Sequence, residues 1–478
     1  MSLPSTLTTL FFFSFSFLLL LHANGGDSTS GMDAKELSAL YEVLGALLDD
    51  PSWPQLHPHP CTDTPWPGVQ CETLPQQQQQ PDPFFHVTKL HVGPDLATPP
   101  CRPGAELSLS LLRLPFLKTL SIFGCFVGAT VTLIPPPLFS SASSLEQLVL
   151  ISNRGLSGPI PTTISLAGRL SVLRLSQNDL RGEIPRGVGE LRELKQLDLS
   201  YNRLTGGIPE ELGGLAGLGI LDLSFNGLRG GIPRSLGRLC SLQKLDLGSN
   251  SLSGRIPEET GMLRKLVLLD LSRNSITGPV PEALSGLEEL EYFLVENNPI
   301  GSGVPLFLGA LGKLAVVGLS GCGLSGPIPS WFESLSNLTA LALDRNRLSG
   351  SVPRSLDALG KLGQLNLSQN MLSGEIAFRE DFVSRLGKRL DVRDNKGLCA
   401  NSHLYFDTPP CGSSSLDATS SARTSTNSSS SAGAEPGAQQ VSGRPPAEDN
   451  GQESLSSPLG SSLCWYLYLG IYAILVFL

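Results

Sequence analysis

Leucine recurs through the middle of this 478-residue chain in a pattern that repeats itself. The segment LSVLRLSQNDLRGEIP at 170–185 is followed by LKQLDLSYNRLTGGIP at 194–209 and LGILDLSFNGLRGGIP at 218–233, so each copy begins 24 residues after the one before. Further copies begin at Leu242, Leu266, Leu290, Leu314, Leu338 and Leu362, and an earlier copy with one inserted residue begins at Leu145. A fixed period with this consensus is typical of a leucine-rich-repeat solenoid. We expect regular repeats over 145–376 inside a solenoid spanning 87–398.

The L-x-x-L-x-L part of each repeat predicts a short strand whose alternate residues face a core, paired in parallel with the strands of neighbouring repeats. Asn follows the last strand leucine by three positions, where a buried amide can satisfy backbone groups of adjacent turns. Cys322 replaces this Asn in one repeat. The predicted fold is an α/β-type repeat solenoid. It is a right-handed superhelix with a parallel β-sheet on the concave face and disulfide-stapled caps.

Most cysteines lie at the ends of the array, and a helical apolar spacing at 33–48 predicts a helix that packs on the first turn. The N-terminal cap then spans 26–86 and the C-terminal cap 399–411. Because a secreted chain uses cysteine pairs to staple small caps, proximity along the solenoid predicts three disulfides. These are Cys61–Cys71, Cys101–Cys125 and Cys399–Cys411. Cys240 and Cys322 are expected to be free, with Cys240 acting as a small buried hydrophobe.

Both ends of the chain carry apolar segments. The sequence LFFFSFSFLLLLHA at 10–23 is followed by small residues and predicts a signal peptide over 1–25. Residues 412–462, rich in Ser, predict a flexible stalk. The uncharged tail at 463–478 then favours a glycosylphosphatidylinositol (GPI) anchor signal, with a single membrane span as the alternative. Either reading attaches the protein to a membrane through its C-terminal tail.

Charge and residue types weigh against two classes of protein. The chain has 43 acidic and 34 basic residues, and this net charge of -9 argues against nucleic-acid binding. None of the regular repeats contains His, and neither a Gly-rich phosphate loop nor a kinase signature occurs, so we expect no enzyme and no catalytic residue. His57, His59 and Cys61 have the donor types of a metal site, but Cys71 nearby favours a disulfide. We therefore expect no metal and no cofactor.

A candidate binding surface follows from the strand positions that face away from the core. Asp198, Asp222, Asp246 and Asp270 occupy the same position in four consecutive repeats, which predicts a row of carboxylates about 4.8 Å apart on the concave face. Tyr201 and Phe225 lie beside this row, and Arg174 and Arg273 lie at its margins. An acidic row beside aromatic rings suits a basic, partly apolar peptide or protein loop. The alternative is that L-D-L-S is an ordinary form of this strand, with acids that only hydrogen-bond across the sheet.

Three N-x-S/T sequons, at Asn337, Asn366 and Asn427, are candidate glycosylation sites in a secreted chain. Asn366 lies between two strand leucines, so its side chain should point out of the concave sheet. A glycan there would cover the C-terminal end of that face.

The N-terminal helix, the cap sequence PWPGVQC at 65–71 and the repeat consensus resemble a plant leucine-rich-repeat receptor ectodomain. EYFLVENNPI at 291–300 and FVSRLGKRLDVRDNKGLC at 382–399 narrow the resemblance to kinase-less receptor-like proteins, the group of TOO MANY MOUTHS, Piriformospora indica-insensitive protein 2 and receptor-like protein 29.

This resemblance implies a non-enzymatic protein on the extracellular face of the plasma membrane. Such a protein binds a secreted peptide or protein ligand and signals through a partner receptor kinase ectodomain, in development or in the response to microbes. The alternative is a secreted cell-wall protein of the apoplast that inhibits a microbial wall-degrading enzyme.

Overall fold

The computed structural model describes residues 31–73, 84–94, 99–128, 131–400 and 409–411. These residues belong to one compact unit, Met1–Ser413. The predicted signal peptide, stalk and C-terminal tail, together with Asn427, lie outside the described residues. Among the helices of the described ranges, none is long and apolar enough to cross a membrane.

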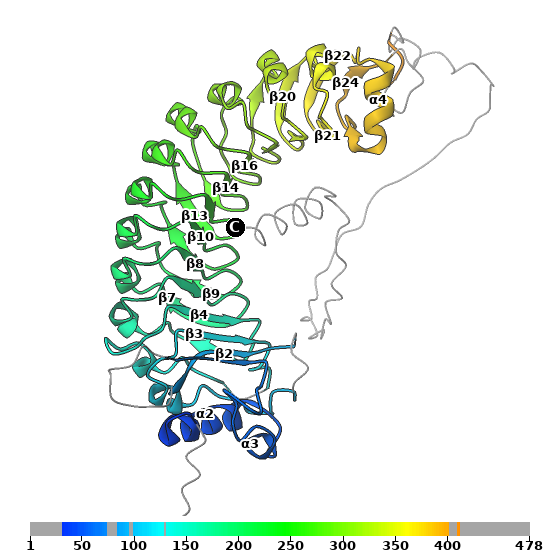
Figure 1. Ribbon diagram of the computed structural model, residues 1–478. Coiled ribbons are helices and arrows are strands. Elements are labelled where there is room, and N and C mark those ends of the chain that lie inside the picture. The colour runs from blue at the N-terminus through cyan, green and yellow to red at the C-terminus, as the bar shows by residue number, and fades with distance from the viewer. Residues whose placement is uncertain (1–30, 74–83, 95–98, 129–130, 401–408, 412–478) are drawn as a thin grey trace, which may run out of the picture. The chain divides into compact units, whose positions relative to one another are not determined.

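One 14-stranded sheet lines the concave side of the described unit (Figure 1). The first two strands pair antiparallel, and every later strand pairs in parallel with the strand one repeat before it. Parallel pairing follows from the repeat, because each strand is reached by the same crossover. The strands are β1 (Val69–Thr73), β2 (Phe85–Val92), β3 (Thr119–Phe123), β4 (Gln147–Ile151), β6 (Val172–Arg174), β8 (Gln196–Asp198), β10 (Ile220–Asp222), β12 (Lys244–Asp246), β14 (Leu268–Asp270), β16 (Tyr292–Leu294), β17 (Val316–Gly318), β19 (Ala340–Ala342), β21 (Gln364–Asn366) and β23 (Leu390–Asp391).

Short strands on one flank of the array form what we call the lateral sheets. Their strands are β5 (Ser157–Gly158), β7 (Asp179–Glu183) and β9 (Arg203–Thr205), then β11 (Arg229–Gly230), β13 (Ser251–Gly254) and β15 (Ser275–Ile276), then β18 (Ser325–Gly326), β20 (Arg347–Gly350), β22 (Met371–Glu375) and β24 (Gly397–Cys399). Because these strands are short and the sheets are interrupted, the lateral flank is less regular than the concave sheet.

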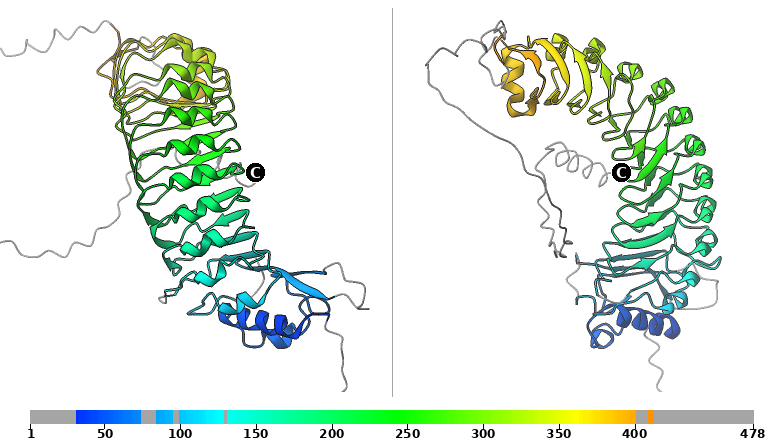
Figure 2. Two further views of the ribbon diagram at one scale, coloured as in Figure 1. Left: turned by 90° about the vertical axis from the view of Figure 1, so that its left-hand side faces the viewer. Right: turned by 180° about the vertical axis from the view of Figure 1, so that it is seen from behind.

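The convex side is built from single-turn 3-10 helices, one in each repeat (Figure 2). In the regular repeats each helix begins directly after the consensus Pro, whose ring fixes the extended turn before it. The helices are η1 (Leu109–Arg113), η2 (Pro136–Leu138), η3 (Thr162–Leu166), η4 (Arg186–Glu190), η5 (Glu210–Gly214), η6 (Arg234–Arg238), η7 (Glu258–Met262), η8 (Glu282–Gly286), η9 (Leu306–Ala310), η10 (Ser330–Ser334), η11 (Arg354–Ala358) and η12 (Gly387–Arg389).

The repeat leucines fill a continuous core, and the Asn column forms a ladder of hydrogen bonds beside it. Asn250 is representative. Its Nδ2 donates to the carbonyl oxygens of Leu223, Leu247 and Gly248 at 3.0–3.2 Å, and its Oδ1 accepts from the Leu228 N–H at 3.1 Å. Each Asn thus bonds both to its own turn and to the preceding repeat. The expected role of this column as a link between turns is confirmed.

Helices and disulfides close both ends of the array. Helix α2 (Ala34–Leu47) is capped by Asp33 and followed by α3 (Trp53–Leu56), while α4 (Glu380–Leu386) covers the last repeats. Disulfides join the three pairs that proximity predicted, Cys61–Cys71, Cys101–Cys125 and Cys399–Cys411. Cys61 therefore has no free thiolate for a metal, and no cluster of metal-ligand type occurs among the described residues.

One expectation about the cysteines is wrong. Cys240 is exposed rather than buried, because its neighbours Leu239 and Leu242 take the core positions. Cys322 is free and fully buried.

Candidate functional site

Four aspartates form a row on the concave sheet, in strict register. Asp222 of β10 pairs with Asp198 of β8 and with Asp246 of β12, and Asp246 in turn pairs with Asp270 of β14. The alignment arises because each strand sits one repeat from the next. Their equivalent positions in sequence therefore become neighbours in space.

These carboxylates lie against the sheet rather than extending into solvent. The side chains of Asp198, Asp222 and Asp246 are only 12–17% exposed. The Oδ1 of each aspartate accepts a hydrogen bond from the backbone N–H of the residue two positions later in the sequence. Asp222 accepts from the Ser224 N–H at 3.1 Å, and Asp270 accepts from the Ser272 N–H at 2.8 Å. The alternative interpretation of L-D-L-S is therefore right that the acids are hydrogen-bonded. All four aspartates bond to the backbone of their own repeat, and Asp222 also accepts a hydrogen bond across the sheet, from Lys244 Nζ at 2.7 Å.

A buried lysine, which the sequence-based prediction missed, neutralises the middle of the row. Lys244 is 7% exposed, and its Nζ lies 2.7 Å from Asp222 Oδ2 and 3.5 Å from Asp246 Oδ2. Burial alone would lower the pKa of Lys244, but the charges of Asp222 and Asp246 raise it overall. The signal was present in the sequence, since Lys244 is two residues before Asp246 and residues two apart on a strand share a face.

At the N-terminal end of the row the negative charge is also compensated. Arg174 Nε lies 3.5 Å from Asp198 Oδ2, an ion pair too long for a well-formed hydrogen bond. Among the described residues, Asp270 has no Lys or Arg within ion-pair distance. Asp270 is therefore the carboxylate of the row that has no close cation beside it among the described residues.

Protonation equilibria are shifted at this C-terminal end. Burial, together with the charges of Asp222 and Asp270, raises the pKa of Asp246 well above its usual range, and burial also raises the pKa of Asp270. Glu296, which the sequence-based prediction did not single out, follows β16. Burial and the nearby charges of Asp270 and Asp344 raise its pKa to about 7. The Oε1 atom of Glu296 packs against Gly318. A Cβ atom added to Gly318 would lie only 2.6 Å from this oxygen.

Tyr201 and Phe225 stack on each other, with ring centroids 4.1 Å apart and planes 10° from parallel. Both have a left-handed backbone, with φ of 52°, which bulky residues rarely adopt. The conformation belongs to the repeat, because the equivalent residue of other repeats shares it. These residues are Ser152, Gln177, Ser249, Arg273, Asn297, Arg345, Gln369 and Asp394. The repeat thus brings the two rings together, and it places Arg273 in the same column.

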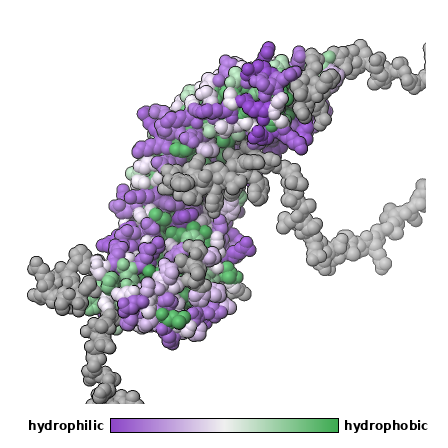
Figure 3. All heavy atoms as spheres, turned by 45° about the vertical axis from the view of Figure 1, so that its right-hand side comes forward, coloured by the Kyte–Doolittle hydropathy of each residue, from purple (hydrophilic) through white to green (hydrophobic). Residues whose placement is uncertain are grey.

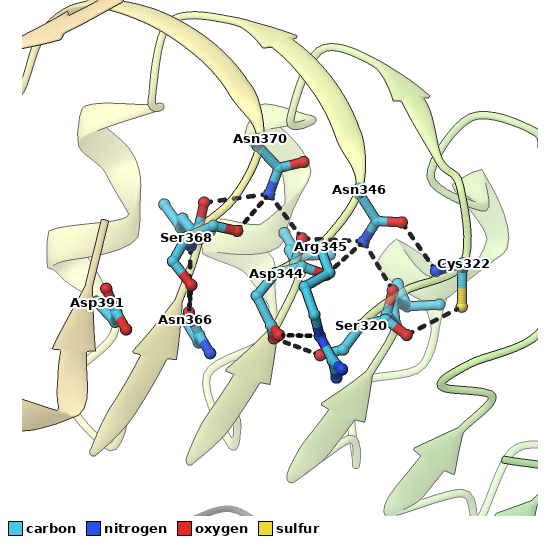
Figure 4. A network of polar contacts seen from close by, with 12 residues as sticks. Ser320, Cys322, Asp344, Arg345, Asn346, Asn366, Ser368, Asn370 and Asp391 are labelled. Atoms are coloured by element: carbon cyan, nitrogen blue, oxygen red, sulfur yellow. Dashed lines mark hydrogen bonds and ion pairs between the residues drawn. The ribbon is translucent and has the colours of Figure 1, made fainter. Parts of the chain in front are cut away.

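Polar contacts continue along the C-terminal strands (Figure 4). Asp344 accepts hydrogen bonds from Ser320 Oγ and, at 3.0 Å, from Arg345 Nε. Asn366 on β21 makes the same local hydrogen bond as the aspartates, because its Oδ1 accepts from the Ser368 N–H, two residues later, at 3.1 Å. The other described sequon residue, Asn337, lies before β19 and donates to the Gly312 carbonyl oxygen at 2.9 Å.

The surface seen in Figure 3 is mostly hydrophilic, with smaller apolar patches between the polar regions.

Comparisons with known proteins agree with this architecture. The leucine rich repeat family model matches residues 168–228, 240–300 and 312–372. Over 175 residues the chain is 42% identical to Receptor like protein 29 of Arabidopsis thaliana, covering 36% of each chain. It is 36% identical to Piriformospora indica-insensitive protein 2 of the same plant, over 34% of this chain and 39% of that protein. The match thus spans little more than a third of the length of either curated relative.

A solved structure supports the fold over a longer stretch. The leucine-rich-repeat ectodomain of the Arabidopsis receptor kinase HAESA, in complex with an N-terminally extended IDA peptide hormone ligand, aligns with a TM-score of 0.60 at 28% identity. The alignment covers 77% of this chain and 57% of that one. The solenoid fold and the resemblance expected from the sequence are confirmed.

Proposed function

We propose that this leucine-rich-repeat chain, which is similar to plant receptor-like proteins, binds a basic, partly apolar peptide or protein loop on its concave face. One observation carries the proposal. The in-register row of Asp198, Asp222, Asp246 and Asp270 lies on the same face as the stacked rings of Tyr201 and Phe225. Aromatic rings supply contact area at low entropic cost, and charge orients the ligand.

The ion pairs within the row indicate where a basic group of the ligand docks. Asp198 is opposite Arg174, and Asp222 is held by Lys244. Asp246 lies 3.5 Å from the same lysine, so Asp270 is the carboxylate of the row that lacks such a partner among the described residues. A ligand cation therefore gains most at the C-terminal end of the row, which sets the direction in which the ligand lies.

Cell-surface signalling completes the proposal. The predicted signal peptide and C-terminal tail put the protein on the outer face of the plasma membrane, where a receptor kinase ectodomain is the partner that passes the signal on. HAESA, which shares the fold, is such a receptor kinase and was solved with a peptide hormone. The chain itself is proposed to bind and not to catalyse. Release of the protein from plant membranes by a phosphatidylinositol-specific phospholipase tests the GPI tether.

The binding test uses variants that spare the buried charges. Reversing Asp222 or Asp246 would leave Lys244 buried among like charges, so the test combines Asp270→Asn with Phe225→Ala. The Asn keeps an oxygen for the Ser272 N–H and removes the charge. The matched control is Asp179→Asn on β7, whose carboxylate pairs with Arg181 and Arg203 on a lateral sheet.

Wild-type and variant proteins are measured by biolayer interferometry against a panel of receptor-kinase ectodomains and synthetic secreted plant peptides. We expect the double variant to bind at least about tenfold more weakly than wild type, and the control to be unchanged. A folded double variant that binds as tightly as wild type would show that the ligand lies elsewhere. Inhibition of a microbial wall-degrading enzyme, with no binding to the panel, would favour the secreted cell-wall alternative.

Glycosylation at Asn366 would limit the ligand to the earlier strands. A glycan on β21 covers the C-terminal end of the concave face, next to the Asp344 and Arg345 contacts. Site mapping of protein from plant cells should find Asn366 occupied, and Asn366→Gln should leave binding to the acidic row intact. An unmodified Asn366 in native protein would remove this restriction.

A further inference from the structure

The lateral sheets are interrupted between β9 and β11 and again between β15 and β18. At the first break backbone hydrogen bonds still join the two repeats, since the Gly227 N–H donates to Leu204 O at 2.8 Å and the Arg229 N–H to Gly206 O at 2.7 Å. The second break is different. One sheet ends at β15 and the next begins at β18, and no backbone hydrogen bond joins residues 275–278 to residues 299–303. In regular repeats the residue after the ladder Asn donates to the preceding repeat, as Ser251 does to the Leu228 oxygen at 2.9 Å. Pro299 occupies this position and has no N–H to donate.

The Asn ladder is broken one repeat later. In regular repeats the ladder Asn accepts the N–H of a leucine or isoleucine in the preceding repeat, as Asn298 accepts from Ile276 at 3.0 Å. Cys322 stands in the next position of the column. Its Sγ lies 3.2 Å from the Val295 oxygen and so replaces the amide donor, but a thiol offers no carbonyl oxygen. The Ile300 N–H turns back to Asn298 O in its own repeat, at 2.8 Å.

The backbone between these two residues departs from the repeat as well. In two preceding repeats the residue with positive φ is the consensus Gly, Gly254 or Gly278. In the next repeat the residue with positive φ is Gly301, with φ of 65°, which lies one position before the consensus Gly position. The Gly301 N–H donates forward to Cys322 O at 3.0 Å, while the equivalent Thr277 N–H donates back to Gly254 O at 2.7 Å. The Gly301 N–H, which in a regular repeat would bond to the repeat before it, therefore bonds to the repeat after it.

The concave sheet runs through the same region unbroken. Strands β14, β16, β17 and β19 pair in register, and the thiol of Cys322 is fully buried. The repeats are therefore fully paired through the concave sheet, but the lateral flank lacks the hydrogen bonds that join regular repeats. We propose that residues 296–325 form a joint, whose lateral flank opens locally while the concave sheet stays paired.

The free energies of a solenoid make such a joint possible. The stability of a repeat array is close to a sum of repeat and nearest-neighbour terms, so one weak interface lowers the cost of local opening below that of global unfolding. The joint lies between the acidic row on β8–β14 and the polar contacts of β19–β21 (Figure 4). If the proposed ligand reaches both, its binding would hold the joint in one curvature, a consequence that rests on the proposed function.

Cys322 makes the opening measurable in the full-length protein, because a fully buried thiol reacts only when its surroundings open. The experiment is iodoacetamide labelling with peptide mapping, at increasing urea, in a chain that also carries Val188→Cys. Val188 is fully buried in a regular repeat and serves as the reference. We expect Cys322 to react at least about tenfold faster than the reference without urea, with a weaker urea dependence. Equal rates with equal urea dependence would overturn the proposal.

A second measurement tests the cause and does not depend on the reference site. Cys322→Asn restores the missing acceptor for the Ile300 N–H, whereas the matched Cys322→Ala does not. We expect Asn to slow hydrogen exchange of the peptide covering 296–305 by about tenfold, and Ala to leave it as fast as wild type or faster. If the Asn and Ala variants exchange alike, the missing acceptor does not weaken this interface and the proposal fails.

Discussion

Replacing Lys244 by Met tests whether the acidic row depends on its buried cation. Lys244 is 7% exposed, and its ammonium lies 2.7 Å from Asp222 and 3.5 Å from Asp246. Met keeps most of the side-chain volume and removes the charge. The two carboxylates then remain in a poorly solvated place, next to Asp198 and Asp270, with no cation between them.

The expected loss follows from the geometry. Removing one partner of a buried ion pair typically costs about 3–5 kcal/mol, because the other charge is left uncompensated. The carboxylates here are 13–17% exposed, so solvent screens them somewhat and we expect the lower end, about 3 kcal/mol. In Asp222→Asn/Lys244→Met one of the two charges is gone, and part of the loss should be recovered.

The pH dependence has a definite sign. Loss of Lys244 removes a charge that lowers the pKa of Asp246, so the pKa of this carboxyl, already raised by burial, rises further in the folded variant. The folded variant then binds protons that the unfolded chain releases, and its stability falls as pH rises above the ordinary pKa of Asp. The destabilisation should therefore be largest near pH 7 and shrink below about pH 5.

Urea unfolding followed by circular dichroism measures these differences at pH 5 and pH 7. The matched control is Lys195→Met, which removes an exposed lysine and should change stability by less than about 0.5 kcal/mol. A loss below about 1 kcal/mol for Lys244→Met at pH 7, or a loss that grows at low pH, would refute the reasoning.

Three further changes test other parts of the structure. Asn250→Ala removes the acceptor of the Leu228 N–H and should cost about 1–3 kcal/mol in urea unfolding; a neutral result would contradict a structural role for the ladder. Gly213→Ala should be clearly destabilising, since the new Cβ would overlap the Ser235 carbonyl oxygen. Gly214→Ala should be tolerated, because its Cβ would lie 3.5 Å from the nearest carbonyl oxygen. Equal melting temperatures of the two variants would argue against close packing of the convex helices. Finally, the raised pKa of Glu296 means that wild-type stability falls as pH rises from about 4.5 towards 7, by at most about 1.4 kcal/mol per pH unit. Glu296→Gln should remove this slope, and parallel pH profiles of the two proteins would count against the shifted pKa.

Much of the fold could be predicted from the sequence because a solenoid turns sequence period into spatial distance. Residues one repeat apart become neighbours, so the spacing alone predicted the parallel sheet, the Asn ladder and the alignment of Asp198, Asp222, Asp246 and Asp270. The disulfide pairs were predictable for the same reason, since cap cysteines close in sequence are also close along the array.

What only the tertiary structure decided is how deeply each side chain is packed and which partner it meets. Periodicity placed Asp222 and Lys244 on one face, but their contact and near-complete burial depend on side-chain packing across three strands. Cys240 shows the same limit, because its leucine-rich surroundings predicted burial, whereas Leu239 and Leu242 occupy the core positions and leave Cys240 exposed. The break at Cys322 was visible as a substitution in the Asn column. Its effect on Ile300 became visible only in three dimensions, since the N–H that bonds within its own turn, instead of to the Asn ladder, lies one repeat away.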